Sequence, residues 1–244
     1  MAWQDPRTTF GQPPVGAASQ TQVAFDAGLR TYMLKVYNYM ASGVLLTGVV
    51  AMLFASSGLA QDIMFGGGPL KWLIILSPLA IVFAMSYGQN KFSTFTIQAM
   101  FWAFAALMGL SMSTIFLVYT GASIAQTFFA TAAAFLGLSL YGYTTKKDLS
   151  GMGTFLIMGV IGLLVAMVIN IFLQSTMMQL VISAIGVLIF AGLTAYDTQR
   201  IKSMYAYVAG TDMVGKTVVL SALSLYLDFI NMFQFLLYFM GNQE

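Results

Sequence analysis

Seven apolar runs of about 20 residues each follow one another along most of this chain. They cover residues 36–57, 71–89, 98–118, 122–143, 154–173, 178–198 and 218–240. A helix rises about 1.5 Å per residue, so each run is long enough to cross the roughly 30 Å hydrocarbon core of a bilayer. Backbone groups in lipid must be hydrogen-bonded within the protein, which favours a helix for each run. The sequence therefore predicts an all-α membrane protein, a seven-transmembrane-helix bundle.

Composition excludes several other classes of protein. Only 7% of the 244 residues are charged, against roughly 25% in an average soluble domain. The chain has no Cys and no His. It therefore offers no thiolate or imidazole for a zinc, haem or iron–sulfur site, and no Cys–His or Ser–His–Asp machinery. The net charge of +2 gives no argument for nucleic-acid binding. We expect no cofactor, no nucleic-acid partner and no enzymatic activity.

The first 34 residues differ from everything that follows. They contain three prolines and no apolar run longer than three residues, and they lack the apolar core of a secretory signal. The sequence predicts a mobile polar tail over residues 1–34, with an interfacial turn at residues 25–30. Residues 35–244 would then form the transmembrane domain.

Basic residues predict how the bundle is oriented. Nine of the ten Lys and Arg residues lie in the tail and in every second loop, which share one side of the membrane. The other side has only Lys71. Because loops rich in Lys and Arg stay in the cytoplasm, we expect the N-terminus to be cytoplasmic. An odd number of spans then places the C-terminus on the opposite side.

Two acidic residues lie inside the predicted spans, Asp197 near the end of the sixth and Asp228 within the seventh. An ionisable group in a span costs on the order of 2.5–3.5 kcal/mol on insertion scales, which makes it a candidate functional residue. Asp197 could instead be a helix-end residue paired with Arg200 at i+3. Asp228 has no basic residue within a helical turn, so the same explanation does not suit it.

A pair formed by these two carboxyl groups would respond to pH. Helix geometry places Asp228 about 10 Å deeper than Asp197, a difference that helix tilt can close. In a low dielectric the two groups cannot both ionise cheaply, so they would titrate as a coupled unit. They could share a proton at lower pH, and at higher pH repel each other or take a hard cation such as Ca²⁺. The polar residues expected to support the pair are Tyr196, Arg200, Asn231 and Asn170.

Small residues and a possible internal duplication also suggest how helices pack. Residues 135–141 resemble residues 190–196, and Gly142 aligns with Asp197. This suggests two related hairpins, although chance similarity between apolar helix ends explains it equally well. Glycines within the runs are expected to permit close helix approach. They are Gly109, Gly137, Gly159 and Gly162.

Residues 195–200 and 224–231 resemble the two signature segments of the Bax inhibitor-1 (transmembrane Bax inhibitor motif) family. Residues 28–30, 36–40 and 142–149 are similar to its bacterial, YccA-like branch. The resemblance implies a central last helix surrounded by the others, and a pH-sensitive calcium leak in the bacterial inner membrane. It also implies that Asp197 and Asp228 form a hydrogen-bonded pair that senses pH.

Other readings of the sequence remain open. A bacterial member of the family modulates a membrane-anchored AAA protease, so this chain could be a non-catalytic regulator of such a partner. Its C-terminal residues 241–244 lack the basic residues that often end family members. An intramembrane aspartyl protease is disfavoured, because Leu225 and Leu227 stand where that class needs glycines. A retinal protein would need a Lys in the middle of the last span, and Lys216 lies at its start.

Overall fold

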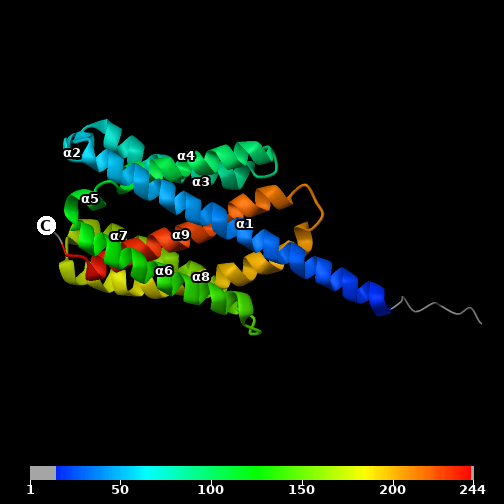
Figure 1. Ribbon diagram of the computed structural model, residues 1–244. Coiled ribbons are helices and arrows are strands. Elements are labelled where there is room, and N and C mark those ends of the chain that lie inside the picture. The colour runs from blue at the N-terminus through cyan, green and yellow to red at the C-terminus, as the bar shows by residue number, and fades with distance from the viewer. Residues whose placement is uncertain (1–14, 243–244) are drawn as a thin grey trace, which may run out of the picture.

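A computed structural model of the chain describes the backbone of residues 15–242, and side chains from residue 23 onward. The described residues form a series of helices and short connections (Figure 1). These helices are α1 (Val15–Ser56), α2 (Leu59–Phe65), α3 (Pro69–Gly88), α4 (Thr94–Met112), α5 (Ile115–Val118), α6 (Gly121–Thr144), α7 (Ser150–Leu173), α8 (Thr176–Val208) and α9 (Val214–Met240).

Seven segments of the described chain are long and apolar enough to cross a membrane. Each of them overlaps one of the seven predicted runs, but the first begins earlier than predicted, at Val23, and the sixth ends later, at Val208. The short helix α5 continues α4 within the third. The breaks have local causes. Pro69 opens α3 at a position where its missing N–H is not needed. The hydroxyls of Ser93, Thr120 and Ser175 accept N–H bonds at the starts of α4, α6 and α8.

The expected tail is partly wrong. Residues 1–14 lie outside the described part, but α1 begins at Val15, so residues 15–34 are helical and residues 25–30 form no turn. This segment packs against α8, a contact that the sequence did not reveal. The Tyr205 ring lies 5.1 Å from the Phe25 ring and 5.3 Å from the Tyr32 ring, centroid to centroid. A Cβ at Gly28 would collide with the Tyr205 hydroxyl.

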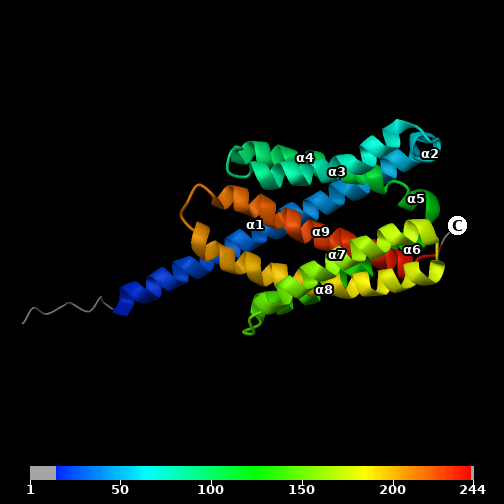
Figure 2. The same cartoon turned by 180° about the vertical axis from the view of Figure 1, so that it is seen from behind.

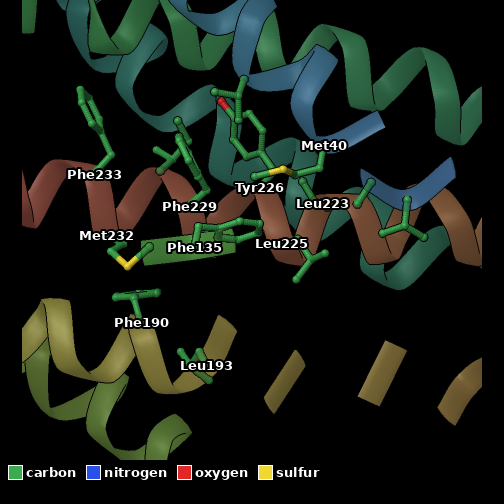
Figure 3. Packing of buried hydrophobic residues seen from close by; sticks show 14 of the residues in the cluster. Met40, Phe135, Phe190, Leu193, Leu223, Leu225, Tyr226, Phe229, Met232 and Phe233 are labelled. Atoms are coloured by element: carbon green, nitrogen blue, oxygen red, sulfur yellow. The ribbon is translucent and has the colours of Figure 1, made fainter. Parts of the chain in front are cut away.

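The last helix is central, as the resemblance implies. In its most apolar 18-residue stretch, 72% of the α9 residues are buried, against 11% in α7. Helices α1 and α4 pack against one side of α9, and α6 and α8 against another (Figure 2). Figure 3 shows Tyr226 of α9 directed toward the α1–α4 side, whereas Met232 points toward Phe190 of α8.

A buried hydroxyl network fixes α9 to α1. The Tyr226 hydroxyl lies 2.6 Å from the Thr47 hydroxyl, which donates to the carbonyl oxygen of Ala105 at 2.8 Å. The Tyr226 ring also packs edge-on against Phe104, with 5.1 Å between the centroids. Because Thr47 donates onward, the Tyr226 hydroxyl is the donor to Thr47. Three helices, α1, α4 and α9, are thus joined at one buried point.

Removing the acceptor from this network is expected to destabilise the bundle. Thr47→Val leaves the Tyr226 hydroxyl buried without a partner, which costs about 1–3 kcal/mol in the free energy of unfolding. Tyr226→Phe removes that hydroxyl altogether and leaves the Thr47–Ala105 bond intact, so its cost is smaller, about 1 kcal/mol. Chemical unfolding of both variants in detergent measures the difference. Equal losses in the two variants would contradict the donor assignment.

The four glycines expected at helix contacts divide into two pairs. A Cβ at Gly109 would lie 2.7 Å from the Thr47 carbonyl oxygen, and one at Gly159 would lie 2.8 Å from Ile189, so both permit close approach. At Gly137 and Gly162 a Cβ would meet nothing within 4 Å. For these two the prediction is wrong, because each lies on an outward-facing side of its helix.

Candidate functional site

Asp228 lies in the middle of the central helix and is almost wholly buried. Its exposed fraction is 4%, and its Oδ2 atom has no hydrogen-bond partner among the described residues. The flanking residues Leu225 and Phe229 are buried too. Buried polar atoms in folded proteins nearly always find a partner, because an unmet one costs free energy. The unpartnered carboxyl oxygen is therefore expected to lower the stability of the bundle.

Asp197 occupies the neighbouring helix α8 near the end of its apolar part. Its side chain is 13% exposed, and its Oδ1 lies 3.8 Å from Nη1 of Arg200, whose side chain is 57% exposed. The i+3 pairing with Arg200, which was the alternative explanation for Asp197, is present. An ion pair this long with one solvated partner contributes little. Arg200 therefore leaves the Asp197 carboxylate largely available for other interactions.

Asp197 and Asp228 lie on α8 and α9, two helices that pack along one another. The charge of Asp197 is close enough to act on Asp228. The described contacts include no hydrogen bond between the two groups, so the direct bond that the resemblance implies is absent from this conformation.

The other expected site residues have separate structural partners. Asn231 donates to the carbonyl oxygen of Leu227 in its own helix at 2.7 Å. Tyr196 packs its ring against Gly153 of α7. Asn170 closes the α7–α8 turn, where its Oδ1 accepts from the Ser175 N–H at 3.1 Å. That turn begins α8, about 30 Å along the helix from Asp197.

Gln199 and Lys202 hold the connection between α6 and α7 against α8, beside Asp197. The Gln199 side chain accepts from the Leu149 N–H at 2.8 Å and donates to the Lys147 carbonyl at 2.8 Å. Lys202 donates to the Tyr143 carbonyl at 2.8 Å and lies over the Tyr143 ring. Sequence reasoning missed both residues. The sequence signal that could have identified them is the position of two polar side chains within two helical turns of Asp197.

The same connection carries a carboxylate whose pH response follows from its contacts. The Ser150 hydroxyl and backbone N–H both hydrogen-bond Asp148, and they lower the pKa of Asp148 below its ordinary value of 3.8. A carboxylate with a lowered folded-state pKa stabilises the fold above its unfolded pKa, and this contribution is lost as pH falls through the folded value. We expect Ser150→Ala to raise the NMR titration midpoint of Asp148. An unchanged midpoint would contradict the hydroxyl's contribution.

A small amide-lined cavity lies one turn further along α9. Its volume is about 220 Å³, and it is enclosed by α7, α8 and α9. Asn231, Gln234 and Gln179 contribute amide groups to its wall, and the remaining wall is mainly apolar. Asp228 lies one helical turn before Asn231, which lines this cavity.

The number of possible ligand groups limits how a cation could bind at this site. Within residues 15–242, no group of three or more Asp, Glu, His or Cys side chains gathers at one point. Ca²⁺ usually takes six to eight oxygen ligands in proteins. Two carboxylates with nearby amide oxygens suit a weak and transient site better than a resident metal.

Comparison with known proteins places the chain in a family. Residues 29–244 match the family described as "Inhibitor of apoptosis-promoting Bax1". An uncharacterized protein of Rickettsia prowazekii is 48% identical over 221 residues, which is 90% of this chain and 93% of that protein. The inner membrane protein YbhL of Escherichia coli is 44% identical over 220 residues, 89% of this chain and 94% of YbhL. The chain therefore belongs to the Bax inhibitor-1 family of integral membrane proteins.

Proposed function

We propose that this protein is a pH-sensitive calcium leak of the bacterial inner membrane, with Asp197 and Asp228 as the pH-sensing pair. The observation that carries the proposal is the buried, unpartnered Oδ2 of Asp228 beside a second carboxyl group. Ionisable groups inside a membrane bundle are costly and typically mark ion or proton pathways. The location of the similar protein YbhL in the inner membrane supports the compartment.

Protonation would act on the contact between α8 and α9. When the pair shares a proton, one carboxyl group can donate to the other, and the two helices stay together. When both groups are ionised, two like charges repel each other in a low dielectric. The α8–α9 contact is then the element that shifts. Ionised oxygens also attract a hard cation, so Ca²⁺ could neutralise the pair briefly during passage.

The route would run from the amide-lined cavity past Asp228 to Asp197. Amide oxygens of Asn231, Gln234 and Gln179 can replace part of the hydration of a cation on one side. On the other side Asp197 is partly exposed. Because Asp228 is only 4% exposed, the conformation described here would correspond to a closed state.

Reconstitution tests this proposal directly. The purified full-length protein is placed in liposomes that contain a Ca²⁺ dye, and the external pH is stepped between about 6 and about 8, a range in which coupled carboxyl groups can titrate. We expect Ca²⁺ flux above that of empty liposomes, with a rate that changes with pH. Flux equal to that of empty liposomes at every pH would rule the leak out.

We also propose that the N-terminus is cytoplasmic, from the nine-to-one division of the basic residues. The chain has no Cys, so single-cysteine variants report location cleanly. Helix α2 and the C-terminal end of α8 lie at opposite ends of the bundle (Figure 1). Phe65 ends α2 and Tyr207 is the second-last residue of α8, and their exposed fractions are 61% and 85%. We expect a membrane-impermeant maleimide to label Phe65→Cys in intact cells, and Tyr207→Cys only after permeabilisation. The reverse pattern would invert the orientation.

A second candidate function is regulation of a membrane-anchored AAA protease. Helix α8 has 33 residues, about 50 Å of helix, so it extends beyond a bilayer core of about 30 Å. The extension presents the exposed ring of Tyr207, the type of side chain that anchors protein interfaces. Cross-linked capture from native membranes should enrich such a protease with the natural chain and less with Tyr207→Ala. Recovery of the same amount of protease from control membranes that lack this protein would exclude the regulatory function.

A further inference from the structure

A large groove opens between α1 and α6. Helix α1 packs on α4 and α9, whereas α6 packs on α8 and α9, and the space left between them has a volume of about 1020 Å³. Phe229 of α9 and Phe135 of α6 contribute to its lining. Small residues leave the space unfilled. At Gly48 of α1, which also lines the groove, a Cβ would meet nothing within 4 Å. We call this space the α1–α6 groove.

The surroundings of the α1–α6 groove are hydrocarbon. Both bounding helices are membrane-spanning segments, and several lining residues are exposed leucines such as Leu45, Leu136 and Leu140. Water does not fill cavities with apolar walls. The volume is at the upper end of the roughly 300–1000 Å³ range of small-molecule sites. An acyl chain from the bilayer has the chemistry and the access to occupy it.

One end of the α1–α6 groove is polar and basic. Arg30 is exposed and lines this end, together with Tyr37 and Tyr143. The ammonium group of Lys202 lies 4.7 Å from the centroid of the Tyr143 ring. A guanidinium group binds phosphate in a bidentate manner, and a tyrosine hydroxyl can donate to the same oxygens. In the orientation proposed above, this end lies at the cytoplasmic leaflet, where anionic lipids concentrate.

We propose that the α1–α6 groove binds an anionic phospholipid, with an acyl chain between α1 and α6 and the phosphate at Arg30. The site is distinct from the carboxyl pair and does not depend on the leak activity. The charge at one end and the apolar walls along the rest match the two parts of a phospholipid. A cholesterol-like ligand has no anionic group and would not use both parts.

Filling the groove provides the first test. Gly48→Leu places a side chain in the space, and Gly162→Leu is the matched control, because a Cβ at Gly162 of α7 also meets nothing within 4 Å but lies outside the groove. Native mass spectrometry of the full-length protein with added phosphatidylglycerol measures binding. We expect one lipid on the natural chain and on Gly162→Leu, and about tenfold weaker binding to Gly48→Leu, because the leucine side chain occupies space that the acyl chain would fill.

Changing the charge provides the second test and does not disturb the helix packing. Arg30→Gln should weaken phosphatidylglycerol binding about fivefold, as expected for one basic residue near anionic lipid. Phosphatidylcholine binding should already be weaker in the natural chain. Melting temperatures establish that each variant is folded. Equal lipid binding by Gly48→Leu and Gly162→Leu, or equal binding of the two lipids by the natural chain, would overturn the proposal.

Discussion

Asp228→Asn is expected to remove the pH response of the Ca²⁺ flux. Asparagine keeps the volume of the buried side chain and cannot ionise, so the repulsion that would shift α8 from α9 cannot develop. Asp197→Asn should have the same effect, because the two groups act as one titrating unit. In the liposome assay, the ratio of rates at the two pH values should fall to about one in either variant.

The matched control is Asp212→Asn, which removes an exposed carboxylate close to the start of α9. It should leave the pH response unchanged. A full pH response in Asp228→Asn would exclude this residue as the sensor even if the protein conducts Ca²⁺. Stability gives an independent measurement. Asp228→Leu removes the unpartnered Oδ2 and should raise the free energy of unfolding by about 1–3 kcal/mol. A loss of stability would indicate that the carboxyl group has a partner.

The overall fold could be predicted because lipid imposes strong rules on a chain. Each span had to contain an apolar helix of about 20 residues, and polar or glycine-containing breaks separated the runs. The breaks did not show that α1 and α8 continue beyond their apolar runs, to Val15 and Val208. The burial of Asp228 could also be anticipated, since its apolar flanks and the absence of a nearby basic residue were visible in the sequence. Apolarity alone did not show which helix is central. The expectation that the last helix is central came from the family resemblance.

Partners distant in the sequence could not be predicted. The segment before residue 34 is polar, and nothing local showed that Tyr205 would pack against Phe25 and Tyr32. Asn170 was expected to support the carboxyl pair because it is polar and lies in a span. Its position at the last turn of α7 lets it close the connection to α8 instead. The role of each glycine was also unpredictable, because the sequence does not distinguish a glycine at a helix–helix contact from one on a lipid-facing side.

Substitution of two glycines of α6 distinguishes a glycine at a helix–helix contact from one on an outward-facing side. A Cβ at Gly142 would collide with the backbone carbonyl oxygen of Ala195, two residues before Asp197. Neither backbone can move aside alone, so Gly142→Ala must separate α6 from α8. It must also strain the nearby hydrogen bond of 3.3 Å between the Thr198 and Ser139 hydroxyls. Overpacking of this kind costs about 1–3 kcal/mol.

Gly137→Ala on the same helix should do the opposite. Its Cβ meets nothing within 4 Å, so the substitution brings only the higher helix propensity of alanine, about 1 kcal/mol in favour of the fold. Unfolding of the two variants in the same detergent should therefore differ by about 2–4 kcal/mol. Because both changes add one methyl group to one helix, composition cannot explain such a difference. Equal stabilities would mean that α6 and α8 are not in backbone contact beside Asp197.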